Sequence, residues 1–112
     1  MNTCYEGIGY LAVTVPAGNC AAGQVCMIDA AGKANACAND GRFMGLCDEV
    51  RKGLAAVQVG GFAKVAYSGT TPSLGFAKLA SDGNGGVAVN SNGQEYLVMA
   101  LDEANKHITI KL

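Results

Sequence analysis

Cysteine is the residue type in this chain with the most varied potential chemistry. Five are present, Cys4, Cys20, Cys26, Cys37 and Cys47. An odd number cannot pair completely within one chain, which argues against a full disulfide framework. No two are close enough in sequence to form the C-x-x-C knuckle of a tetrahedral zinc site. The spacing therefore favours free thiols that fill a core in a reducing cytoplasm.

Histidine and the carboxylates do not suggest a catalytic set. His107 is the chain's one histidine, and a general base needs a nucleophile or an orienting acid within reach. Its place on the polar face of the last expected strand predicts a solvated ring. Asp29, Asp40, Asp82 and Asp102 fall where strands are expected to end, a position that Asp favours because it bonds its own backbone. No pair of carboxylates is singled out for glycoside hydrolysis, and we expect no enzymatic activity.

Two glycine-containing segments invite comparison with ligand loops. The segment D-G-N-G-G at Asp82–Gly86 lacks the alternating oxygen ligands of a calcium loop and is not followed by a helix that could hold a phosphate, so it predicts a turn. A biotinyl or lipoyl carrier needs a lysine at the tip of a tight hairpin, and Lys33 next to Gly32 is the nearest match. The surrounding D-A-A-G-K-A lacks the residues that flank such a lysine. We expect no metal and no cofactor.

Composition indicates a small, nearly neutral domain. The chain has 112 residues, half of them hydrophobic, and a formal net charge of −1. Without a basic stripe, nucleic acid is not an expected partner. No apolar run reaches the roughly 18–20 residues of a membrane span, so no membrane partner is expected. The N-terminus lacks the basic residues that open a signal peptide, and Tyr10–Val15 is better interpreted as a strand.

Short apolar runs separated by Gly, Asn and Asp predict an antiparallel β fold. The expected strands, besides the run at Leu54–Tyr67, are Tyr10–Val15, Gln24–Asp29, Lys33–Ala38, Arg42–Leu46, Phe76–Ser81, Val87–Asn90, Glu95–Leu101 and His107–Leu112. No helical periodicity and no repeat at a fixed interval is evident. The fold class is therefore all-β: a small curved β-barrel or β-sandwich.

Some segments allow finer expectations. Asp48–Gly53 is charged and is expected to lie between strands, with room for one helical turn. Leu54–Tyr67 is either a hairpin turning at Gly60-Gly61 or one bent strand with a glycine bulge; valines that keep their phase through the glycines favour the bent strand. Glu95–Leu101 is expected to be a central strand covered on both faces, and His107–Leu112 a half-buried edge strand.

The chain divides into a short arm and one domain. Residues 1–9 have little periodicity and are expected to form a loosely ordered N-terminal arm, followed by a single β domain over residues 10–112. Aromatic residues are few, and the candidate partner contacts are Tyr5, Tyr10, Tyr67 and Phe76. Tyr67 and Phe76 flank the wide loop Ser68–Gly75 and are the pair expected to be exposed.

The order of these motifs resembles the capsid decoration (capsid cement) proteins of tailed bacteriophages. The residues that carry the resemblance extend over roughly 20–112: G-Q-V-C-M-I-D-A-A-G-K-A (Gly23–Ala34), R-F-M-G-L (Arg42–Leu46), A-V-Q-V-G-G-F-A-K-V (Ala56–Val65), G-T-T-P-S-L-G-F-A-K-L-A-S-D-G-N-G-G-V (Gly69–Val87) and the terminal Tyr96–Leu112. The strand through Gly60-Gly61 matches a valine-rich strand of that family. The cysteine content is higher than is usual there.

The resemblance implies a non-enzymatic, β-barrel or tulip-shaped protein on the capsid exterior. It implies the major capsid protein as partner, synthesis in the cytoplasm of a host bacterium, and a homo-oligomer, with a trimer as one form. The arm at residues 1–9 would order on its partner. The alternative from another class is a small ligand- or carbohydrate-binding β module, which would group exposed aromatic residues on one surface.

Overall fold

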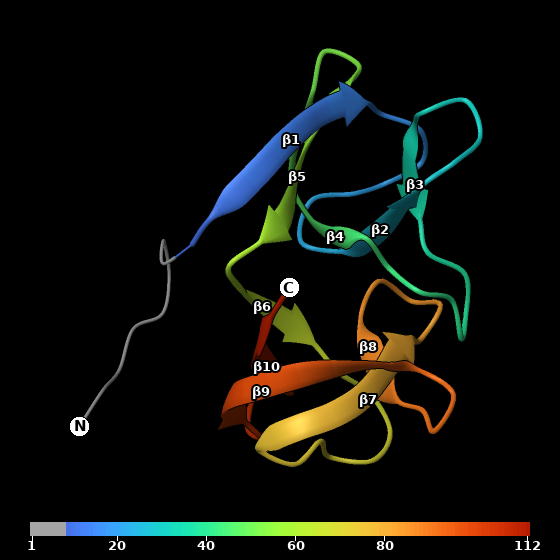
Figure 1. The fold of residues 1–112 in the computed structure, drawn as a ribbon. Helices are drawn as coiled ribbons and strands as arrows, with labels where there is room; N and C mark the ends of the chain where they lie inside the picture. Colours follow the sequence, from blue (N-terminus) through green and yellow to red (C-terminus); the bar gives the residue numbers. More distant parts are fainter. Residues whose placement is uncertain (1–8) are drawn as a thin grey trace.

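The computed structural model describes residues 9–112, and every regular element within them is a β-strand (Figure 1). The strands are β1 (Leu11–Pro16), β2 (Val25–Ile28), β3 (Ala34–Ala36), β4 (Gly45–Arg51), β5 (Leu54–Gly60), β6 (Phe62–Ala66), β7 (Gly75–Ser81), β8 (Val87–Val89), β9 (Gln94–Asp102) and β10 (His107–Lys111). The predicted all-β class is confirmed. Of the predicted arm at residues 1–9, all but Gly9 lies outside the described residues.

The strands form two five-stranded antiparallel sheets, one above the other in Figure 1. The first sheet has the order β1-β5-β4-β2-β3 and the second β6-β10-β9-β7-β8. In each sheet the two edges meet at one isolated parallel bridge, Ala17 with Ala34 and Tyr67 with Val87. Because a single bridge is not a continuous ladder, neither sheet closes into a barrel. The fold is a pair of strongly curved sheets packed together.

The chain passes between the sheets at Gly61. β5 ends at Gly60 in the first sheet and β6 begins at Phe62 in the second, while Gly61 has a φ of 84° that favours glycine. The buried Gln58 side chain secures this crossing, because its Nε2 donates to the backbone oxygens of Gly60 at 3.0 Å and Phe62 at 2.9 Å. β5 and β6 do not pair, so the hairpin interpretation is wrong. The chain does run on from one sheet to the other, as the bent-strand interpretation expected, but as two strands in separate sheets rather than as one strand.

The two sheets are built to the same plan, which makes the protein an internal duplication. Each strand of the first half (residues 11–60) has a counterpart in the second half (residues 62–112), in the same order and with the same neighbours. Hydrogen bonds beyond the strands match as well: Ala17 N–H donates to the Gly53 oxygen at 2.9 Å, and Tyr67 N–H donates to the Lys106 oxygen at 3.0 Å. The sequence did not reveal this repeat because its interval varies.

Each half encloses its own apolar cluster at equivalent positions. In the first half Cys47 lies opposite Val57, and in the second half Val98 lies opposite Ile110. All four side chains are buried, the first pair in a small cluster and the second pair in a larger one. The smaller cluster uses cysteine and alanine where the larger one uses leucine, isoleucine and valine.

Three expectations about individual strands are wrong, the third of them in part. β4 continues through Asp48–Arg51, which was expected to lie between strands, because the chain reverses later, at Lys52-Gly53, where both residues have positive φ. β10 lies between β6 and β9 and is not an edge strand. β9 is central as expected, but most of its residues are only half-buried, so it is not covered on both faces.

Candidate functional site: an apolar groove and an exposed strand

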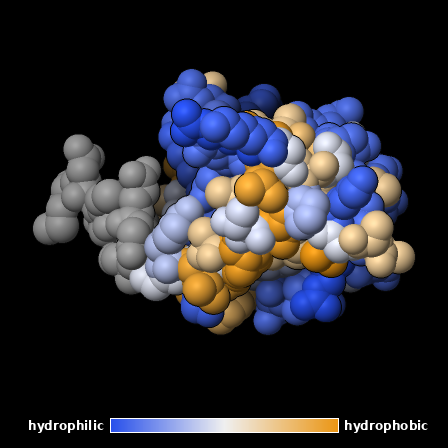
Figure 2. Space-filling view, turned by 90° about the horizontal axis from the view of Figure 1, so that it is seen from above, coloured by the Kyte–Doolittle hydropathy of each residue, from blue (hydrophilic) through white to orange (hydrophobic). Residues whose placement is uncertain are grey.

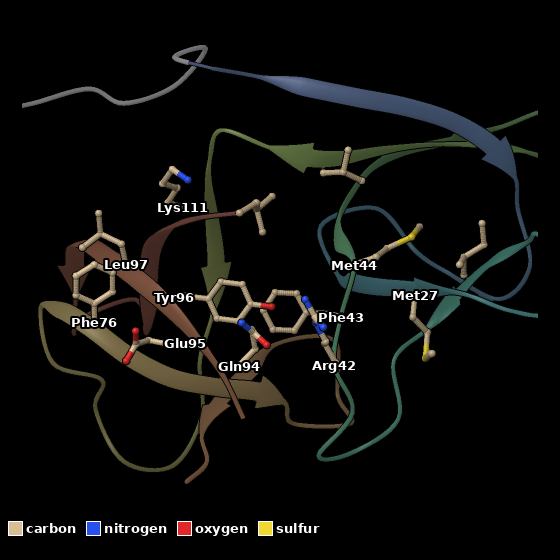
Figure 3. A pocket seen from close by; sticks show the side chains of 13 residues that line it. Met27, Arg42, Phe43, Met44, Phe76, Gln94, Glu95, Tyr96, Leu97 and Lys111 are labelled. Atoms are coloured by element: carbon tan, nitrogen blue, oxygen red, sulfur yellow. The ribbon is translucent and has the colours of Figure 1, made fainter. Parts of the chain in front are cut away.

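A groove of about 820 Å³ lies between the two sheets. It is lined mainly by apolar side chains of both halves: Met27, Ile28, Phe43, Met44, Val59, Phe76, Tyr96, Leu97 and Leu112. The remaining lining residues are Arg42, Gln94, Glu95 and Lys111 (Figure 3). A few charged groups around an apolar surface are typical of a site that binds by shape.

Two stacked rings join the halves at this groove. Phe43 precedes β4 and Tyr96 lies on β9; their ring centroids are 4.9 Å apart and the rings are within 12° of parallel (Figure 3). Burial raises the pKa of Tyr96, against the opposing influence of the neighbouring Arg42 cation. The stack packs the loop before β4 onto the second sheet and keeps the rings aligned.

Strand β1 presents a second apolar surface. Its residues are mostly exposed although they are Leu-Ala-Val-Thr-Val-Pro, and it pairs with β5 along one edge only. Leu11 and Val13 are both exposed, as is Tyr10 just before the strand, whose hydroxyl donates to Asp48. In the view from above, apolar residues gather in one patch with hydrophilic residues around it (Figure 2). A bare apolar edge strand is a ready template for association.

The predicted partner contacts fare differently. Phe76 is 70% exposed and lies on the rim of the groove, which confirms its expected exposure, and Tyr10 is also exposed. The expected exposure of Tyr67 is wrong: it is 4% exposed because the chain continues from β6 to bridge Val87, which turns the ring into the larger cluster. Tyr5 lies outside the described residues. The sequence analysis missed Met27 and Ile28, which β2 brings to the groove from the first half, and Leu97, which β9 brings from the second.

The described cysteines are free thiols, and all but Cys20 are buried. Burial raises the pKa of Cys26 to about 12 and that of Cys47 to about 11. The Cys20 and Cys47 sulfur atoms are 4.0 Å apart. Residues 9–112 contain no group of three His, Cys, Asp or Glu residues suited to hold a metal ion. The expectation that thiols fill a core is confirmed for Cys26, Cys37 and Cys47.

Three of the candidate aspartates accept hydrogen bonds from backbone N–H groups of their own turns. Asp29 and Asp82 are two of these, so the turn expected at Asp82–Gly86 is confirmed. Asp102 does the same for Asn105. His107 is half-buried, and its Nδ1 is buried without a hydrogen-bond partner, so the expected solvated ring is wrong.

Known proteins offer no closer guide. No family model, no curated protein and no solved structure matches this chain. Within residues 9–112 there is also no helix long and apolar enough to cross a membrane. The functional argument therefore depends on the groove, on β1 and on the motif resemblance.

Proposed function

We propose that this protein is a structural component of tailed-bacteriophage heads. It binds the outside of the capsid, bridges neighbouring major capsid subunits and so stabilises the head filled with DNA. It is made in the bacterial cytoplasm and acts in the virion as a homo-oligomer. The resemblance of the motifs Gly23–Ala34 and Gly69–Val87 to decoration proteins supports this proposal, and the fold is of the all-β class that the resemblance implies.

The observation that carries the proposal is the amount of apolar surface that the domain leaves uncovered. Exposed large apolar side chains occur along β1 and along the groove, among them Leu11, Val13, Ile28 and Phe76. Contiguous apolar patches on a soluble domain mark places where another macromolecule docks. A protein that adheres by such surfaces needs no reactive group.

Repetition of the contact supplies the strength that a small domain lacks. When many copies each bridge adjacent subunits of a shell, the second contact of each copy forms at high effective concentration. Because the groove is mainly apolar and the net charge is −1, attachment to the shell should depend little on salt. Weak individual contacts would then combine into a stable coat.

Cosedimentation with empty shells of the cognate major capsid protein tests the proposal. Wild-type protein should pellet with shells in a saturable manner, at low and at high salt. Ile28→Glu places a charge on the groove and should reduce the bound fraction by about tenfold. Val89→Glu, at a similarly exposed position on β8 outside the groove, is the matched control and should bind as wild type. Wild-type protein that stays in the supernatant at saturating shell concentration would exclude the proposed function.

The groove also gives some support to a ligand-binding module. Its volume of about 820 Å³ and apolar lining are within the range of small-molecule sites. Titration with oligosaccharides and with a medium-chain fatty acid, followed by tyrosine fluorescence, separates the two functions. Saturable binding that Ile28→Glu abolishes would favour the module; no response is expected of a decoration protein.

A further inference from the structure

The internal duplication shows which surfaces of the chain are left incomplete. The larger cluster holds the inner face of the second sheet, including Val65 and Ile108, together with four residues of the first half, Val25, Cys37, Phe43 and Leu46. The smaller cluster holds the equivalent inner face of the first sheet but only residues of the first half. The first half therefore covers the second, and nothing within residues 9–112 covers the first in the same way.

Equivalent positions on β1 and β6 differ in exposure for this reason. Val13 lies opposite Val57 as Ala63 lies opposite Ile110, so the two residues occupy the same place in their sheets. Val13 is 40% exposed, whereas Ala63 is 2% exposed. The side chain at the β6 position is the smaller one, so size alone does not explain the exposure of Val13. The first-half residues that pack over the second sheet have no equivalent over β1 within residues 9–112.

The covering surface of the first half also has a counterpart. It includes the cross-strand pair Val25–Leu46, which faces the second half and is buried; Val25 N–H also donates to the Gly85 oxygen of the second half at 3.0 Å. The corresponding pair between β7 and β9 is Phe76–Leu97. Leu46 also pairs with Gln58 on β5, and Leu97 also pairs with Lys111 on β10. Because β5 and β10 are counterparts, the two pairs occupy equivalent places in their sheets.

The Phe76–Leu97 pair is not buried as its counterpart is, because Leu97 is only half-buried and Phe76 is exposed. Phe76 is 70% exposed, whereas Val25, its counterpart, is fully buried. Leu97 lies beside Phe76 on the wall of the groove (Figure 3). Within one chain, the Val25–Leu46 surface of the first half packs on the inner face of the second sheet. The equivalent surface of the second half, at Phe76, and the equivalent inner face of the first sheet, at Val13, have no such partner within residues 9–112.

We propose that a second copy of this chain supplies the missing partner, so that copies associate head to tail. The Phe76–Leu97 face of one copy packs on the Leu11–Val13 face of the next, which repeats between copies the contact that each copy makes between its halves. Such a contact joins two different surfaces, and it closes into a ring when the rotation between copies divides a full turn. This contact uses Leu11, Val13 and Phe76, which the proposed function also counts among the docking residues. Its test concerns the protein in solution without capsid, so the two proposals can fail separately.

Light scattering coupled to size exclusion, with Val13→Glu and Phe76→Glu, tests the contact. Wild type should be oligomeric, and each variant alone should be monomeric because one face is blocked. A mixture of the two variants should form a complex of one copy of each, because each variant contributes the face that the other lacks. That complex should not grow further. Val89→Glu, an equally drastic change on β8, should remain oligomeric as wild type.

Several results would overturn the proposal: a monomeric wild type at the highest soluble concentration, assembly of Val13→Glu or Phe76→Glu alone, or a mixture of these two that stays monomeric. A symmetric contact through β1 alone would be blocked by Val13→Glu but not by Phe76→Glu, and would also overturn it. Thermal melting followed by circular dichroism checks that each variant folds. Leu11→Glu, at another exposed position on the same face of β1, replaces Val13→Glu should that variant unfold.

Discussion

Asp29 and Asp82 hold the two equivalent hairpin turns of this protein with the same hydrogen bonds. In each turn the Oδ1 atom accepts from the backbone N–H groups two and four residues later, at distances between 2.7 and 3.1 Å. The aspartate N–H in turn donates to the backbone oxygen four residues later. The glycine three residues after each aspartate, Gly32 or Gly85, has positive φ. The duplication therefore extends to the detail of single turns.

Acid should destabilise the protein partly through the turns at Asp29 and Asp102. Hydrogen bonds from the Lys33 backbone and the Asn35 side chain hold the pKa of Asp29 below its ordinary value, and those from Asn105 do the same for Asp102. A lowered pKa in the folded state contributes stability above the unfolded pKa of about 3.9, and that stability is lost as pH falls.

Urea unfolding between pH 6 and pH 2.5, about the range in which carboxylates titrate, measures this loss. Asp29→Asn keeps the Oδ1 acceptor but cannot titrate, so its stability should depend less on pH than that of wild type. Glu103→Gln removes an exposed carboxylate elsewhere and serves as the control. An unchanged pH profile for Asp29→Asn would contradict the assignment.

The Phe43–Tyr96 stack should be the aromatic contact on which stability depends most. Phe43→Ala removes a buried ring that joins the halves and should lower the free energy of unfolding by about 3–5 kcal/mol. Phe76→Ala removes a ring that is mainly exposed and should change it by less than about 0.5 kcal/mol. Denaturant unfolding at low protein concentration compares them. Equal losses for both variants would mean that the stack is not a structural joint.

Glycines at close contacts should be less replaceable than glycines in open turns. A Cβ at Gly45 would lie 2.0 Å from the Gln58 backbone oxygen across the β4–β5 ladder, so the strands would have to separate. A Cβ at Gly69 would meet nothing within 4 Å, and only the φ of 74° would be strained. Gly45→Ala should cost about 3 kcal/mol or more, and Gly69→Ala about 1–2 kcal/mol. Melting temperatures that reverse this order would refute the expected clash.

Alkaline pH should weaken the fold through its buried thiols. The pKa values of Cys26 and Cys47 are raised in the folded state, so their stabilising effect is complete below the unfolded pKa of about 8.5 and is lost as pH rises toward 11–12. Cys26→Ala should flatten the fall in stability above pH 8.5, roughly the pKa of a free thiol. The control is Cys20→Ala at the less buried thiol. A profile that Cys26→Ala leaves unchanged would show that other groups cause the alkaline loss.

Alkylation of native protein examines the same thiols by a second route. In a Cys4→Ser background, iodoacetamide should label the partly exposed Cys20 first, because the thiolate is the reactive species and the remaining cysteines are buried. Peptide mass spectrometry reads the order of labelling. Labelling of Cys26 as fast as Cys20 would mean that the first half opens readily.

Local elements were predictable because their causes are local. Gly32 sets the turn of the β2–β3 hairpin, and the apolar alternation of Ile108 and Ile110 predicts a buried face for β10; both features are present. The valines that keep phase through Gly60-Gly61 correctly argued against a hairpin at these glycines. These patterns depend on residues within a few positions of one another.

Pairing between distant strands was not predictable in this way. Alternation in β10 shows that one face is buried but not which strands flank it, so a strand between β6 and β9 was expected at an edge. Tyr67 was expected to be exposed beside its loop, yet its bridge to Val87 buries it. The groove combines short segments from both halves, and no local pattern brings Ile28 and Leu97 to one surface.

The all-β class and most of the turns follow from the amino-acid sequence, because backbone conformation and alternation are set by neighbouring residues. The tertiary structure alone decided that the chain is a duplicated fold. Equivalent positions such as Cys47 and Val98 share burial but not identity, and turns of unequal length shift the interval from 50 positions between Val13 and Ala63 to 53 between Val57 and Ile110. Burial depends on volume and surroundings rather than on residue type, so the two halves can share a fold without sharing a sequence pattern.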